Sequence, residues 1–226
     1  MSEYALMKRF SPKILLASAL LLASGGAFAD HNLWMGVKAG TLGFGVEGAW
    51  RPIPWFDVRV GANQFSYDET GSQAGVNYDA DLSLDTIYGT ANFRFPLSPM
   101  RFTVGLHSNG NELQLVSQEA ETIEIGGIVY PGDQVGTLNS VTSFSDSSPY
   151  AGIGFDFDLF DKVGLNLDLG VLWQGDPDVT LDASGPLAGD PIFQDALEQE
   201  RQELVAEVED YKAWPVVSLG FTYQFL

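Results

Sequence analysis

The chain has 226 residues, contains no cysteine and carries a formal net charge of −19. The lack of cysteine excludes disulfides and zinc–thiolate sites, and a content of 12% aromatic residues with only 18% charged residues is not that of a disordered chain. The acidic balance argues against nucleic-acid binding, because phosphate contacts need clustered Lys and Arg.

Residues 1–29 have the pattern of a secretory signal peptide. The segment begins with the basic residues Lys8, Arg9 and Lys13, and an apolar run follows over 14–23. Small residues at Ala27 and Ala29 then form a cleavage site. The apolar run is shorter than the about 20 residues that a spanning helix needs. We predict cleavage after Ala29, which leaves a mature chain over 30–226 with 8 basic and 29 acidic residues, a net charge of −21.

Apolar and polar residues alternate with a period of two along most of the mature chain. Between 163 and 171, for example, Val163 and Leu165 point one way while Asn166 and Asp168 point the other. This pattern predicts strands near 32–39, 42–50, 55–67, 82–95, 101–117, 149–159, 162–174 and 213–225. The alternation changes phase between Leu84 and Ile87, which indicates either a β-bulge or the rim of a membrane.

Three features favour a membrane barrel over a soluble sandwich, which would alternate too. The polar face is built of small residues with isolated charges of both signs, and aromatic residues gather near strand ends, as they do at membrane interfaces. Short connections alternate with long polar ones near 68–80, 118–147 and 176–211. We predict an all-β fold, a transmembrane antiparallel up-and-down β-barrel of about eight strands.

With the strand faces assigned in this way, seven charged residues point into the barrel: Lys38, Glu47, Asp57, Arg59, Arg94, Asp156 and Asp168. Buried charges need partners, and an eight-stranded barrel is narrow enough for side chains to fill it. We therefore predict an interior charge network that plugs the barrel. The inward positions of Tyr88 and Leu172 make them candidate lining for a pocket near the outer mouth, which is the alternative interpretation.

One segment has helical rather than strand periodicity. Asp190 is placed to cap a helix with Pro191 at its first position. Apolar residues then recur at helical spacing, at Phe193, Leu197, Leu204, Val208 and Tyr211. With both termini in the periplasm, this amphipathic helix near 190–211 falls in the last external loop. We expect its stripe to pack on the barrel mouth or the loops, and a partner-binding helix is the alternative.

The last strand carries alternating aromatic residues, Phe221, Tyr223 and Phe225. With the signal peptide and the strand count, this ending resembles that of small Gram-negative outer-membrane barrels of the OmpA-barrel and OmpW-like type. The resemblance implies the cell outer membrane as location, outer-membrane lipid and lipopolysaccharide as surroundings, and a terminal strand that the barrel assembly machinery reads. In those families the last residue is commonly Phe, whereas here Leu226 follows Phe225.

No catalytic, cofactor or metal motif stands out. His107 and Ser108 invite comparison with outer-membrane lipid A deacylases, but adjacent strand residues point to opposite faces and cannot form a nucleophile–base pair. His31 and His107 are the only histidines, so a zinc site is not expected. The acidic loops offer oxygen ligands, but nothing matches the spacing of a dedicated calcium loop, so we expect a solvated acidic face there. Divalent cations that bridge these loops to lipopolysaccharide phosphates are the alternative.

Three functions follow from these observations. The first is a non-enzymatic barrel with a plugged interior and a structural or surface-interaction role. The second, which the OmpW-like resemblance suggests, is a narrow channel or carrier for small or hydrophobic solutes. A lipid A-modifying enzyme is the third, and the spacing of His107 and Ser108 disfavours it.

Overall fold

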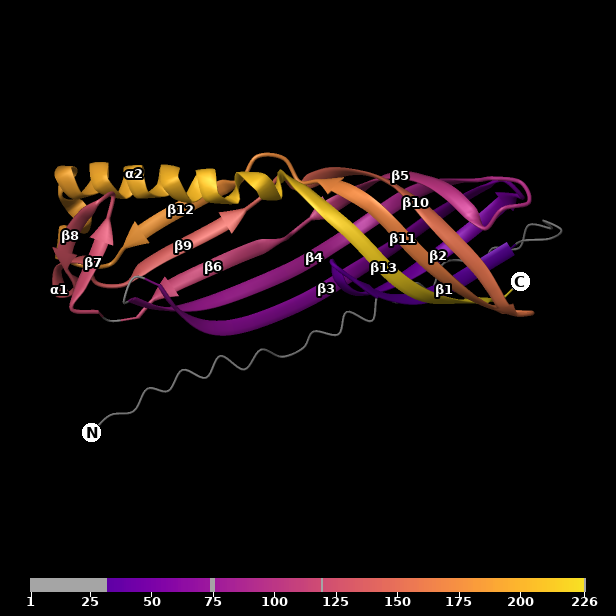
Figure 1. Ribbon diagram of the computed structural model, residues 1–226, viewed down its shortest axis with the longest axis horizontal. Coiled ribbons are helices and arrows are strands. Elements are labelled where there is room, and N and C mark those ends of the chain that lie inside the picture. Colours follow the sequence, from indigo (N-terminus) through magenta and orange to yellow (C-terminus); the bar gives the residue numbers. More distant parts are fainter. Residues whose placement is uncertain (1–31, 74–75, 119, 226) are drawn as a thin grey trace, which may run out of the picture.

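The computed structural model of the protein describes residues 32–73, 76–118 and 120–225, so the signal peptide predicted over 1–29 lies outside the described residues. Eight strands form an antiparallel barrel: β1 (Asn32–Gly40), β2 (Gly43–Ile53), β3 (Phe56–Gln73), β4 (Val76–Arg94), β5 (Met100–Asn109), β10 (Ser147–Phe160), β11 (Val163–Trp173) and β13 (Ala213–Gln224). Each pairs with the next in this order, and β13 pairs with β1 to close the barrel (Figure 1). The predicted eight-stranded barrel is confirmed.

The two faces of the barrel have opposite character. Apolar side chains such as Val37, Phe44 and Val60 are 59%, 69% and 59% exposed on the outside. Polar and charged side chains fill the inside, where Asn92 and Asp57 are 0% and 1% exposed. This is the arrangement of a barrel whose outer surface faces lipid, and it is the reverse of a soluble sandwich.

At one end of the barrel the sheet continues past the closed region. Strands β3 and β4 run on, and β6 (Glu112–Ser117), β9 (Leu138–Ser143) and β12 (Asp178–Ala183) extend the sheet in the order β3-β4-β6-β9-β12. The remaining elements are β7 (Thr122–Ile125), β8 (Ile128–Pro131), α1 (Gly132–Val135), the 3₁₀ helices η1 (Pro186–Gly189) and η2 (Glu209–Lys212), and α2 (Pro191–Val208). We call residues 66–85, 110–146 and 174–212 the extension.

The segments predicted as long polar loops are therefore largely structured. Within 68–80, β3 and β4 stay paired as far as Gln73 and Val76. The single strand predicted over 101–117 is two strands, because the chain turns at Gly110, whose amide donates to the carbonyl of Asp85. Beyond that turn β6 pairs with β9 instead of β10. These pairings join segments far apart in the sequence, which local patterns do not reveal.

The phase change near Leu84 marks the rim of the lipid-facing belt and not a β-bulge. The pairing of β3 with β4 runs without a shift through both Leu84 and Ile87. Below the rim, inward Thr86 is polar and outward Ile87 is apolar, whereas above it inward Leu84 is buried and outward Asp85 is exposed. The polarity of the two faces inverts where the strand leaves the lipid-facing belt.

Helix α2 begins where the sequence predicts. The Asp190 carboxylate accepts hydrogen bonds from the amides of Ile192 (2.8 Å) and Phe193 (3.1 Å). Phe193 and Leu197 are buried in a small core that belongs to the extension, with Ala196, Ile123, Ile125, Val135 and Leu138. The first part of the predicted stripe thus packs on the extension, whereas Tyr211 at its end is 53% exposed. No helix in the described part of the chain has the length and apolar character needed to cross a bilayer.

Candidate functional site

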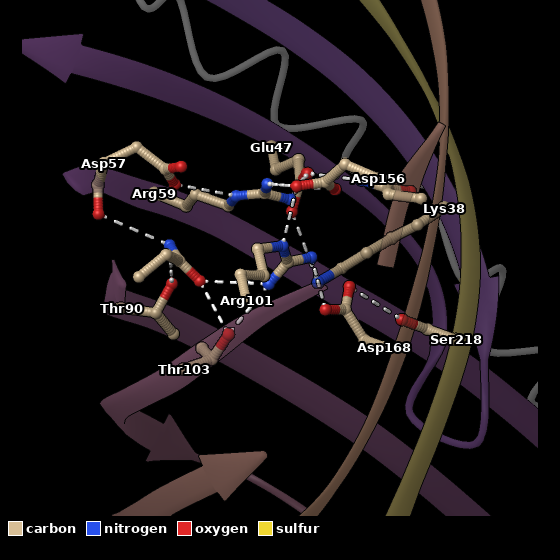
Figure 2. A network of polar contacts seen from close by, with 12 residues as sticks. Lys38, Glu47, Asp57, Arg59, Thr90, Arg101, Thr103, Asp156, Asp168 and Ser218 are labelled. Atoms are coloured by element: carbon tan, nitrogen blue, oxygen red, sulfur yellow. Dashed lines mark hydrogen bonds and ion pairs between the residues drawn. The ribbon is translucent and has the colours of Figure 1, made fainter. Parts of the chain in front are cut away.

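A network of ion pairs crosses the barrel interior, and Arg59 on β3 lies near its centre (Figure 2). The Arg59 guanidinium donates to Asp57 (3.2 Å), to Glu47 on β2 (3.1 Å) and to Asp156 on β10 (3.2 Å). Arg94 on β4 reaches the same Asp57 (2.6 Å) and Asp156 (2.7 Å). One guanidinium therefore joins strands that lie on different sides of the barrel.

A second arginine, Arg101 on β5, completes the network and is 1% exposed. Its guanidinium donates to Asp156 (3.0 Å), to Asp168 on β11, and to Asn92 (3.0 Å). A further bond goes to Thr103 (2.8 Å). These four hydrogen bonds use all three nitrogens of the guanidinium, and a buried arginine needs such partners.

All seven charged residues that the sequence analysis placed inside the barrel take part in this one network. Lys38 contributes an ion pair with Glu47 at 3.6 Å. Sequence analysis missed Arg101. Arg101 is the first residue of the strand predicted over 101–117, where the alternation begins. Reading it back from His107 through Thr103 would have placed Arg101 on the inner face, because alternate strand residues share a face.

Glycine makes room for the network at one point of closest approach. Gly154 on β10 faces inward, and a Cβ there would overlap the guanidinium of Arg101. The strand backbone itself therefore forms part of the wall against which the guanidinium packs, and this is a common reason for glycine within a strand.

Aromatic residues lie between this network and the extension. The Tyr88 hydroxyl donates to Glu47 (2.9 Å), and the Lys38 ammonium lies 4.0 Å from the centre of the Tyr88 ring. His107 stacks on Tyr88 with ring centres 5.0 Å apart and contacts Tyr150 at 5.4 Å. An apolar cluster closes this side of the barrel, and it consists of Leu42, Tyr150, Leu172, Val216 and the partly buried Trp214.

Two cavities lie on either side of the network. The larger, of about 820 Å³, opens at the end with the short turns and is lined by Arg51, Asp57, Arg94 and Lys162 among others. The smaller, of about 30 Å³, lies between the network and the apolar cluster, and this is room for about one water molecule. The pocket that the sequence suggested around Tyr88 and Leu172 is thus almost filled by side chains.

The side chains of His107 and Ser108 diverge, as the strand geometry predicts. His107 is 4% exposed inside the barrel and Ser108 is exposed on the outside. Among residues 32–73, 76–118 and 120–225 there is no group of three or more His, Cys, Asp or Glu side chains that could hold a metal ion.

The extension carries most of the net charge. It contains 22 acidic residues and only two basic ones, Arg201 and Lys212. Both basic residues pair within the extension, Arg201 with Glu198 and Lys212 with Glu209 and Asp176. Hydrogen bonds from Arg201 and Gln202 lower the pKa of Glu198 to about 2. With 22 acidic residues against two basic ones, the surface of the extension is strongly negative.

A closed eight-stranded barrel with an apolar outer belt and a filled polar interior defines an outer-membrane β-barrel protein. The chain is similar in structure to CarO2 of Acinetobacter baumannii, with a TM-score of 0.57 and 21% identity over 87% of this chain and 100% of that one. It is similar to CarO of the same organism, with a TM-score of 0.57 and 22% identity over 85% and 97% of the two chains. At this identity the likeness concerns the fold. No family model matches the chain, and no curated protein matches it.

Proposed function

We propose that this protein is a non-enzymatic barrel of the outer membrane whose interior is plugged and whose acidic extension serves a structural or surface-interaction role outside the cell. The observation that carries the proposal is the network around Arg59 and Arg101, which ties β2, β3, β4, β5, β10 and β11 together across the lumen. A solute would have to break several buried ion pairs to pass.

The outer-membrane location rests on the lipid-facing belt and on the last strand. Phe221, Tyr223 and Phe225 are 52%, 45% and 48% exposed on the outer face of the barrel, where the barrel assembly machinery could read them. The end with short turns would face the periplasm and the extension would face outward, as is usual for such barrels. Membrane fractionation tests this point, because a chain released with the periplasm by osmotic shock would contradict it.

Lipopolysaccharide is the proposed neighbour of the extension. Asp79 and Asp81 point outward from β4 just above the apolar belt and are exposed. Divalent cations would bridge such carboxylates to lipid phosphates in a diffuse layer, because like charges otherwise repel. Removal of divalent cations by a chelator should then loosen the extension against trypsin in lipopolysaccharide-containing vesicles but not in neutral detergent.

Planar-bilayer recording of the full mature chain tests the plug. We expect no steady conductance from the native protein and discrete openings from a variant with Arg59→Ala and Arg101→Ala. The matched control is Arg201→Ala with Lys212→Ala, which removes the same charge from the extension and should stay silent. A gel shift between heated and unheated samples shows that each variant is a folded barrel.

The alternative function is a narrow channel, and the cavity of about 820 Å³ at the turn end is the observation that favours it. That cavity reaches Arg59 and Asp156, so a channel would need only the network and the apolar cluster to open. Steady conductance of the native chain would replace the plugged-barrel proposal with this one.

A further inference from the structure

Strand β3 has one edge without a partner strand in the extension. Its pairing with β2 ends at Gln64, which lies opposite Phe44, whereas its pairing with β4 continues to Gln73. Over Ser66–Gly71, no described strand therefore pairs with the side of β3 that faces away from β4. All six residues of this segment are exposed. We call the segment 66–71 the open edge.

The opposite edge of the same sheet is covered by a helix. Strand β12 forms that edge and pairs only with β9 among the described strands. Helix α2 packs along β12, as Figure 1 shows at the top of the extension, while β3 forms its lower border. Proteins usually cover or blunt the edges of a sheet, which prevents pairing with other chains. An edge that stays uncovered, in a sheet whose opposite edge is covered, is therefore a candidate site for the addition of a strand.

The open edge is well formed for such pairing. Its register with β4 has no bulge, so its backbone is regular up to Gln73. The Thr70 hydroxyl donates to Asp79 on β4 (3.0 Å), and the rings of Phe65 and Tyr67 stack with centres 6.5 Å apart. The segment contains neither proline nor lysine, the residues that most often protect an edge.

Charge decides which partner fits. Asp68 and Glu69 project from the open edge, on a module with 22 acidic and two basic residues. A second copy of this chain would place like charges opposite one another, which destabilises strand pairs, whereas Lys or Arg opposite them stabilises the pair. We propose that the open edge binds an extended, Lys- or Arg-bearing segment of another protein as an additional β-strand.

This inference rests on the proposed surface-interaction role, but its test is a binding measurement that does not depend on the conductance of the barrel. The probe is a fluorescent eight-residue peptide of alternating lysine and threonine, added to the full mature chain in neutral detergent. Fluorescence anisotropy compares it with a peptide in which proline replaces every threonine. The two peptides have the same charge, but proline cannot donate the backbone hydrogen bonds of a strand pair. We expect at least tenfold weaker binding of the proline peptide.

Cysteine cross-linking then locates the peptide. The native chain has no cysteine, so only an introduced one reacts. Asp68→Cys on the open edge and Asp81→Cys, which lies directly opposite it on β4, are matched exposed positions on the same face of the sheet. With a cysteine in the peptide, we expect cross-linking at least tenfold faster to position 68 than to position 81.

Several outcomes would overturn the inference. Equal binding of the two peptides, or equal cross-linking at both positions, would show diffuse electrostatic adhesion. No change in anisotropy at high peptide concentration would show that the edge does not accept a strand. Disulfide-linked dimers of the Asp68→Cys chain without peptide would show that a second copy occupies the edge. None of these results changes the conductance of the barrel, so the plugged-barrel proposal stands or falls separately.

Discussion

Replacing Arg101 with methionine is the strongest single test of how the barrel interior is held together. Methionine has a comparable apolar stem but no charge, so the substitution empties little space and removes the guanidinium. Among the described residues, Asp168 then keeps a long hydrogen bond from Ser218 at 3.5 Å and the electrostatic attraction of Lys38, whereas Asp156 retains Arg59 and Arg94. The change therefore removes the ion-pair partner of one buried carboxylate and leaves the rest of the network in place.

The expected loss follows from that isolated charge. Removing one partner of a buried ion pair destabilises a protein by about 3–5 kcal/mol, because the remaining charge is uncompensated. Replacing both partners with apolar residues is often close to neutral. We therefore expect Arg101→Met to lower the free energy of unfolding by about 3–5 kcal/mol, and Arg101→Met with Asp168→Leu to recover most of it.

Urea unfolding in detergent micelles measures the free energy of unfolding of each variant, with the fluorescence of the five tryptophans as the signal. Arg201→Met is the control, since its exposed ion pair with Glu198 is screened by water and should contribute little to stability. Equal losses from the single and double variants would show that packing, not charge compensation, sets the cost. A loss below about 1 kcal/mol for Arg101→Met would refute the central role of this residue.

Three further predictions concern other parts of the chain. Gly154→Val should lower the unfolding free energy by about 1–3 kcal/mol, because its side chain meets the Arg101 guanidinium, and urea titration measures this. Asp190→Ala should destabilise α2 by about 1 kcal/mol through the lost cap and speed amide exchange there, while exchange in the barrel strands stays unchanged. Val60→Arg should destabilise the barrel by about 2–4 kcal/mol, because Val60 is the middle residue of the part of β3 that spans the lipid. Thr70→Arg, on the same face of β3 but above the rim, should be nearly neutral.

The barrel could be predicted from sequence because its signal is repeated and local. Each spanning strand alternates on its own, and the polar face with paired charges sets it apart from a soluble sheet. The same alternation placed Glu47, Arg59 and Asp168 inside without any knowledge of which strands would be neighbours. The distances between these side chains and their ion-pair partners could not be predicted from sequence, because they depend on how the strands tilt and stagger around the closed barrel.

The extension was not predicted, for two physical reasons. Its strands β6, β9 and β12 have six residues each, fewer than the about 9–11 of a spanning strand, and their pairing joins segments more than 20 residues apart in the chain. On these strands the buried positions also mix apolar with small polar residues, such as Leu138 with Ser140 and Thr142 on β9, so they lack the alternation that marks the spanning strands. The helix was found because its cap at Asp190 and its 3.6-residue period are independent of tertiary pairing.

Lipid explains where the barrel closes and where it opens. On β4 the segment from Thr86, just below the rim, to Arg94 has nine residues, and the part of β3 between Phe56 and the end of its β2 pairing at Gln64 has nine as well. A tilted strand needs about 9–11 residues to cross the hydrocarbon. Within that thickness every backbone group needs a protein partner, so the sheet must be closed. Above the rim water satisfies free edges, and it is there that the closed barrel gives way to an open sheet and that the edge of β3 is free to pair with another chain.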